Sequence, residues 1–122
     1  MEKTKTIGDR AEEAAAEHLK SKGYKILARN WRRTKAEIDI VAQRNLRKGW
    51  RREKTVYFVE VKYRSSDSQG SGLEYITGAK LKQMQFAAKL WASEENWTGN
   101  YELSAIEVTG DSRVTAHVET LT

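Results

Sequence analysis

The sequence predicts one α/β domain in which helices pack on a mixed β-sheet. Two observations carry this prediction. Apolar residues recur at helical spacing in two segments, and apolar or alternating runs of strand length occupy five others. The order of elements is α-β-β-β-α-β-β. Because 122 residues form one domain of ordinary size and no repeat or linker interrupts them, residues 1–122 are expected to fold as a single unit.

The first helix is predicted from Thr6 to about Lys22, and Gly23 follows it as a stop signal. Three strands are predicted next, at residues 24–31, 36–43 and 56–64. They imply two antiparallel hairpins, the second with a basic loop from Asn45 to Glu53 at its tip.

A polar loop from Ser65 to Gly72 precedes the second helix, which is predicted to begin near Thr77 or Gly78. Two short strands, at residues 103–108 and 114–118, complete the chain. The apolar face of the second helix is wider than a single stripe and comprises Leu81, Met84, Phe86, Ala87, Ala88, Leu90 and Trp91.

The strand at 56–64 has two different faces. Alternation predicts that Tyr57, Val59, Val61 and Tyr63 share one face, which is apolar throughout. Both faces begin apolar, which is typical of a central strand covered on both sides. Charge enters only at the end of the second face, which carries Val56, Phe58, Glu60, Lys62 and Arg64.

A second carboxylate is expected beside Glu60. In the strand at 36–43, Ile38, Ile40 and Ala42 are predicted to point one way, and Glu37, Asp39 and Val41 the other. The hairpin then brings Asp39 and Glu60 to one face of neighbouring strands. Two carboxylates a few ångströms apart repel each other and raise a pKa, so the pair indicates a hard cation such as Mg²⁺ or Mn²⁺. The alternative is a solvated salt bridge between Glu60 and Lys62.

Composition excludes other chemistries. The chain has no cysteine, so it forms no disulfide framework or thiolate metal site. His18 and His117 are far apart in the sequence and are interpreted as isolated, which predicts neither a zinc site nor a catalytic triad. No segment has the length and apolarity of a membrane span or a signal peptide, so the expected location is cytoplasmic.

The formal net charge of +5 is typical both of a protein with an anionic partner and of one with a merely solubilising excess of lysine, so the distribution of the cations has to decide. Two basic runs are rich in arginine, one around Trp31 and one around Trp50. The expected partner is nucleic acid, with DNA first and RNA as the alternative. Trp50, on the basic hairpin tip, is a candidate for stacking on a base.

Several motifs together resemble the YraN-type family. They are G-D-R-A-E-E-A-A-A-E-H-L from Gly8, G-Y-K-I-L-A-R-N-W-R from Gly23, E-I-D-I-V-A from Glu37, F-V-E-V-K-Y-R from Phe58, and a following helix with Lys80. That family consists of small, mostly bacterial, predicted endonucleases similar in fold to archaeal Holliday junction resolvases. It belongs to the PD-(D/E)XK nuclease superfamily, which implies a restriction-endonuclease-like core.

The resemblance implies a metal-dependent endonuclease that acts on DNA, including branched or junction-like DNA. Asp39 and Glu60 would hold Mg²⁺ or Mn²⁺ with the carbonyl of Val61, Glu12 would reach the metal from the first helix, and Lys62 would orient or deprotonate the attacking water. A homodimer would suit two-fold junctions. The predicted nucleic-acid contacts are Arg32, Arg33, Arg47, Lys48, Trp50, Arg51, Arg52, Arg64 and Lys80.

Two other interpretations of the sequence remain open. A non-catalytic basic module would bind DNA or RNA through the hairpin from Arg44 to Lys54 without metal. A dimeric interaction protein would instead use a surface around Trp91 and Trp97.

Overall fold

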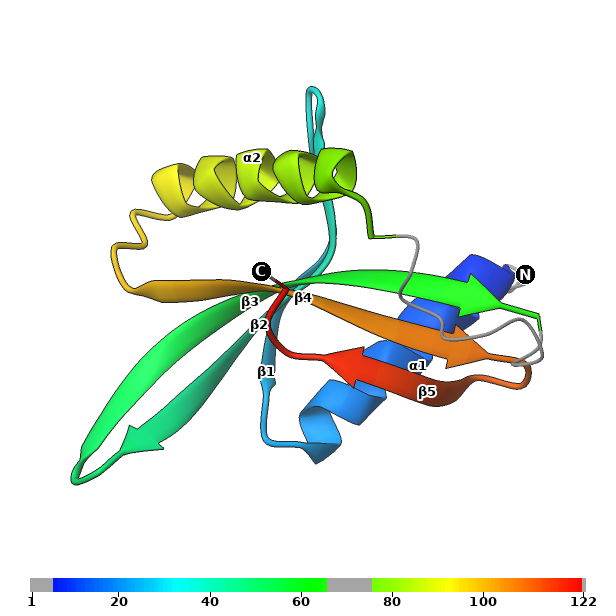
Figure 1. Ribbon diagram of the computed structural model, residues 1–122, viewed down its shortest axis with the longest axis horizontal. Helices are drawn as coiled ribbons and strands as arrows, with labels where there is room; N and C mark the ends of the chain where they lie inside the picture. The colour runs from blue at the N-terminus through cyan, green and yellow to red at the C-terminus, as the bar shows by residue number, and fades with distance from the viewer. Residues whose placement is uncertain (1–5, 66–75, 122) are drawn as a thin grey trace, which may run out of the picture.

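Seven elements follow one another in the predicted order in the computed structural model, which describes residues 6–65 and 76–121 (Figure 1). All of the predicted polar loop except Ser65 lies outside these residues. In the described parts of the chain, no helix is both long and apolar enough to cross a membrane. The elements are α1 (Ile7–Ser21), β1 (Lys25–Arg33), β2 (Ala36–Lys48), β3 (Arg51–Arg64), α2 (Gly78–Glu94), β4 (Asn100–Thr109) and β5 (Arg113–Val118).

The five strands form one mixed, twisted sheet in the order β1-β2-β3-β4-β5. Neighbouring strands are antiparallel except for β3 and β4, which are parallel and connected through α2. In Figure 1, α1 and α2 lie on opposite faces of the sheet. The predicted fold class, a mixed sheet flanked by helices, is therefore confirmed.

The core is divided between the two faces of the sheet. On the α1 side, Leu19 packs with Ile40 and Val59, and all three are almost fully buried. On the α2 side, Phe58 packs with Trp91, their ring centroids 5.4 Å apart. Because β3 contributes to both clusters, it is the doubly covered central strand that its sequence predicts.

Local capping signals fix the helix boundaries. The Thr6 side chain accepts a hydrogen bond of 3.1 Å from the Asp9 N–H, and the Thr77 side chain accepts one of 3.1 Å from the Lys80 N–H. Gly23, just after α1, has a φ of +90°, which glycine adopts without a steric cost. The first helix therefore begins and ends where the sequence predicts, and the second begins where it predicts.

The predicted basic loop from Asn45 to Glu53 is wrong, because β2 and β3 remain paired out to Lys48↔Arg51. Only Gly49 and Trp50 form the turn, and Gly49 has a φ of +62°, as expected of the first central residue of a type II′ turn. We call residues 44–55 the basic ribbon. Figure 1 shows it projecting away from both helices at the lower left.

Other burial predictions also need correction. Phe86 is 53% exposed, although it was assigned to the apolar face of α2. Trp91 is only 6% exposed, so the proposed interaction surface around it and Trp97 lies largely in the core. Ile38 packs on the α2 side and Ile40 on the α1 side, because the alternation along β2 is interrupted at the residue between them.

Candidate active site

The two strands that carry Asp39 and Glu60 diverge where these residues lie. Backbone pairing between β2 and β3 ends at Ile40↔Val59. Beyond that pair the Asp39 carboxylate replaces a backbone acceptor, since its Oδ2 accepts a hydrogen bond of 2.8 Å from the Val61 N–H. The side chain of Asp39 thereby links the strands at the point of divergence.

The structure brings Asp39 and Glu60 together, as the hairpin predicts. The pKa of Asp39 is raised to about 7, first by burial and then by the adjacent charge of Glu60, while the hydrogen bond from the Val61 N–H acts in the opposite direction. The more distant Glu12 adds a smaller rise. Keeping Asp39 ionised therefore costs the folded protein free energy unless a cation compensates.

Lys80 supplies one such positive charge. Its Nζ lies 2.7 Å from Glu60 Oε2, and the capped first turn of α2 positions its backbone. Burial lowers the pKa of Lys80, but the hydrogen bond and charge of Glu60, with the charge of Asp39, outweigh burial and leave the pKa raised. Lys80, predicted as a nucleic-acid contact, is thus a partner of the carboxylates in this structure.

Lys62 lies two residues after Glu60 on the same face of β3, and its side chain is exposed. In the parallel ladder it is opposite Glu107, which is only 4% exposed. Glu107 forms an ion pair with Arg64, with 3.0 Å between Arg64 Nε and Glu107 Oε2. Arg64, a predicted phosphate contact, thus has its Nε committed to Glu107 in this structure.

Glu12 lies on α1, half-buried, and is held by a residue that the sequence analysis missed. The Asn30 side-chain amide lies against the Glu12 carboxylate, and we assign its NH₂ to that side, because it then donates to both Glu12 oxygens at 2.7 and 3.1 Å. Burial raises the pKa of Glu12, and the charge of Arg29 opposes the rise. The sequence signal that could have identified Asn30 is its place inside a predicted strand, where asparagine is disfavoured. The structure explains the exception, since Asn30 adopts a φ of +51°, which asparagine tolerates better than most residues.

The carboxylates fit a weakly coordinated hard cation. Within the described residues, no group of three or more His, Cys, Asp or Glu side chains forms a metal cluster. Asp39 and Glu60 are therefore a two-carboxylate set. Mg²⁺ commonly uses one or two carboxylates and completes its octahedron with water and substrate phosphate. The residues present match that requirement better than the closed ligand set of a structural metal.

A basic depression of about 470 Å³ opens beside the carboxylates. It shares Glu37 and Met84 with the narrow crevice that contains Asp39 and Glu60. Phosphates bound in the depression would lie next to the two carboxylates. The depression is lined by Arg32, Arg33, Lys35, Ala36, Glu37, Lys80, Gln83 and Met84.

The other predicted nucleic-acid contacts are distributed unevenly. Among the described residues, Arg32 forms an ion pair only with Glu37, a long, exposed contact of 3.9 Å, whereas Arg33 pairs with Glu94 at 2.8 Å and stacks on Trp31. The remaining five lie on the basic ribbon, the nearest of them, Arg52, roughly 26 Å along β3 from Glu60 at about 3.3 Å per residue. They are Arg47, Lys48, Trp50, Arg51 and Arg52.

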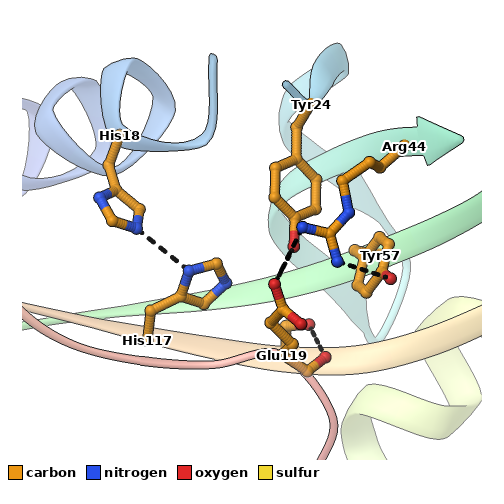
Figure 2. Close-up of polar contacts among 7 residues, drawn as sticks. His18, Tyr24, Arg44, Tyr57, His117 and Glu119 are labelled. Carbon is orange, nitrogen blue, oxygen red and sulfur yellow. Dashed lines mark hydrogen bonds and ion pairs between the residues drawn. The ribbon is translucent and has the colours of Figure 1, made fainter. Parts of the chain in front are cut away.

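The interpretation of His18 and His117 as isolated is wrong. His18 Nε2 lies 3.1 Å from His117 Nδ1, joining α1 to β5 across 99 positions of sequence (Figure 2). Burial lowers the pKa of both imidazoles. No local sequence pattern predicts this contact, because it depends on how the last strand returns beside the first helix.

Figure 2 also shows why Arg44 does not belong with the cations of the ribbon tip. Its guanidinium lies over the Tyr24 ring, 4.3 Å from the centroid, and near the Tyr57 ring. Its Nη1 is 3.0 Å from Glu119 Oε1, which also accepts a hydrogen bond of 2.9 Å from the Tyr24 hydroxyl. Arg44 therefore ties the base of the ribbon to the end of the chain.

Residues 11–112 match the family model described as "Uncharacterised protein family UPF0102". A UPF0102 protein of Mycolicibacterium smegmatis is 41% identical over 93 residues, which cover 75% of this chain and 70% of that protein. A UPF0102 protein of Cytophaga hutchinsonii is 33% identical over 104 residues, 85% of each chain. One of Flavobacterium johnsoniae is 33% identical over 118 residues, 92% of this chain and 89% of the relative.

Proposed function

Because the chain belongs to the uncharacterised family UPF0102, and because two carboxylates adjoin a basic depression on its sheet, we propose that it is a metal-dependent endonuclease that hydrolyses phosphodiester bonds in DNA. The same proposal assigns the fold to the PD-(D/E)XK nucleases, similar to the archaeal Holliday junction resolvases.

The observation that carries the proposal is the burial of Asp39 beside Glu60. Fold stability alone disfavours this arrangement, as the raised pKa of Asp39 indicates. Strongly perturbed carboxylates beside a cleft are typical of functional sites. Lys80 compensates only part of the negative charge, so an additional cation has a reason to bind here.

Bound Mg²⁺ or Mn²⁺ would supply relief of the phosphate's negative charge and would make a water more acidic. Asp39 and Glu60 would hold the ion with the Val61 carbonyl, and Glu12 would contribute from α1 directly or through water. Lys62, exposed on the same face of β3 as Glu60, would orient or deprotonate the attacking water. Arg32 and Lys80 would bind phosphates of the strand in the basic depression.

The proposal is tested by cleavage of plasmid, linear and four-way-junction DNA in Mg²⁺ or Mn²⁺. Asp39→Asn and Lys62→Ala are each expected to lower the rate by about 100-fold or more while leaving the fold intact. Glu17→Gln is the matched control, because Glu17 is exposed on α1 and, within the described residues, pairs only with Lys20. Cleavage that persists unchanged in Asp39→Asn would refute the assignment.

The basic ribbon favours a second candidate function, a nucleic-acid-binding module without catalysis. Such a module would bind DNA in EDTA with an affinity that falls steeply as salt increases. It would show no cleavage of any substrate in either metal. Binding that is identical in wild type and Asp39→Asn, together with absence of metal binding, would support this function instead.

A further inference from the structure

The tip of the basic ribbon exposes a large aromatic side chain. Trp50 is 90% exposed, far more than Phe86, the next most exposed aromatic residue of the described chain, at 53%. A tryptophan ring is a large apolar surface that proteins usually bury at least in part. Its position at the end of a projecting two-stranded arm makes it accessible to a partner from several sides (Figure 1).

Like charges face each other behind this tip. Arg47 is directly opposite Arg52 in the ladder, and Lys48 is directly opposite Arg51. Directly opposed like charges destabilise a β-hairpin. Only Lys48 has an ion pair, at 3.4 Å to Glu53, and no carboxylate in the described part of the chain pairs with the three arginines. An anion bound across the ribbon would relieve this repulsion.

The two faces of the ribbon differ in the cations that they leave available. One face carries Arg44, which is closed by Glu119, the pair of Lys48 with Glu53, and a single exposed arginine, Arg51, at the tip. The other face carries Asn45, Arg47, Arg52 and Lys54, all of them exposed. By alternation, this second face continues along β3 into the face that carries Glu60.

We propose that the basic ribbon is a DNA-binding arm that grips the phosphate backbone through Arg47 and Arg52 and stacks Trp50 on an unpaired base at a gap or end of the duplex. A two-stranded ribbon has the width that the major groove admits. Base stacking on an aromatic ring requires a base freed from its pair, so the arm distinguishes interrupted from continuous duplex.

The proposal deepens the proposed nuclease function, because the arm selects the DNA that the carboxylates would cut. The contact itself needs no metal. Trp50 precedes Glu60 by ten residues, about 33 Å along the ribbon and β3 at about 3.3 Å per residue, roughly the rise of ten base pairs at about 3.4 Å each. An unpaired base stacked on Trp50 would thus direct the basic depression to duplex about one helical turn away.

The test measures binding in EDTA with the Asp39→Asn protein, by fluorescence anisotropy, on a blunt duplex and on the same duplex carrying a short single-stranded gap. We expect tighter binding to the gapped duplex. Trp50→Ala should weaken that binding about tenfold and change blunt-duplex affinity little. Trp50→Phe should retain most of the preference, and Phe86→Ala, the matched aromatic control on α2, should retain all of it.

The charged part of the arm is tested by changing Arg47 and Arg52 together to alanine. Affinity for both duplexes should fall, and the slope of log affinity against log salt should become shallower by about 2. The control is Lys82→Ala with Lys89→Ala, two exposed cations on α2 that give the same change in net charge. An equal effect of the two double variants would overturn the role of the ribbon.

Other outcomes separate this inference from the nuclease assignment. Equal affinity for gapped and blunt duplex in wild type, or equal losses on both with Trp50→Ala, would overturn the stacking role even if cleavage is observed. Gap preference that depends on Trp50 in a protein that never cleaves would support the arm and reject the nuclease. Self-association lost in Trp50→Ala, without any effect on DNA, would overturn the proposal and assign the tip to a second copy of the chain.

Discussion

Asp39 and Glu60 lie together in an otherwise apolar part of the sheet, where the Val61 N–H donates to Asp39 and the Lys80 ammonium contacts Glu60. The carboxylate pair follows from strand alternation and one hairpin. The contact of Lys80 with Glu60 does not, because it depends on where α2 starts relative to β3. Asn30 escaped notice because its role depends on a left-handed backbone that places its amide against Glu12.

Asp39→Asn should stabilise the metal-free protein. At pH 7.5 the substitution removes a buried charge beside Glu60, and the asparagine oxygen can still accept from the Val61 N–H. Because the pKa of Asp39 is raised, its ionisation costs the folded state free energy. We expect the free energy of unfolding in EDTA to increase by on the order of 1–3 kcal/mol, measured by urea denaturation.

Addition of Mg²⁺ should make wild type the more stable of the two proteins, because the ion binds wild type and leaves the free energy of unfolding of Asp39→Asn unchanged. Glu17→Gln serves again as the surface control and should change neither quantity by much. A lower stability of Asp39→Asn in EDTA would mean that the carboxylate serves the fold and would remove the main reason to expect a cation.

The histidine pair should make stability depend on pH. Burial lowers the pKa of His18 and His117 below the ordinary value of 6.5, and the nearby charge of Lys22 lowers both further. For His117, Arg44 acts in the same direction and Glu119 opposes it. The stability linked to these groups is complete above pH 6.5 and is lost as the pH falls through their folded-state pKa values.

The melting temperature of wild type should therefore fall more steeply between pH 7 and pH 5 than that of the double variant His18→Gln with His117→Gln. Glutamine can hydrogen-bond but does not titrate in this range. Parallel curves for the two proteins would show that the contact between α1 and β5 does not respond to protons.

At the level of helices and strands, most of the fold could be predicted because its signals are local. Thr6, Thr77 and Gly23 mark helix ends through their own side chains or backbone angles. The apolar run of β3 indicates a covered central strand. Phe86 is an instructive exception, because it was assigned to a broad apolar face, while the buried positions of α2, Met84, Ala87, Ala88 and Trp91, lie on the other side of the helix.

The basic ribbon was predicted to be a loop because strands are identified from the alternation of buried apolar and exposed polar side chains, and the ribbon is not buried. Its strands lack apolar alternation, and arginine and lysine carry no strand preference. What keeps them paired is a two-residue turn at Gly49 and Trp50 and a base fixed by Arg44 against Glu119. The dipeptide of glycine and tryptophan between basic runs was the available signal for a tight hairpin.

Arg52→Glu should affect stability and binding in opposite directions. It converts the repulsive pair with Arg47 into an attractive one, so the free energy of unfolding should rise by about 0.2–1 kcal/mol. Affinity for DNA should fall, because a phosphate contact becomes a repulsion. Urea denaturation and anisotropy on the same preparation measure both changes, and a decrease in both quantities would contradict the ribbon's role as a strained, anion-binding arm.

For the whole molecule, β3 connects the two candidate surfaces. It runs from the basic ribbon through the centre of the core to the diverging end that carries Glu60 and Lys62. The sheet thus holds a cationic arm and a carboxylate crevice in a fixed relation. Contacts between the ends of the chain, such as Tyr24 with Glu119, complete this arrangement and were invisible in local sequence patterns.

The most direct measurement is a Mn²⁺ titration of ¹⁵N-labelled protein, in which amide signals near the bound ion are lost through paramagnetic broadening. It requires no substrate and detects weak binding. We expect selective loss around residues 38–40 and 59–62 in wild type and no such loss in Asp39→Asn. Scattered loss over surface carboxylates, identical in the two proteins, would contradict a metal-dependent active site in this crevice.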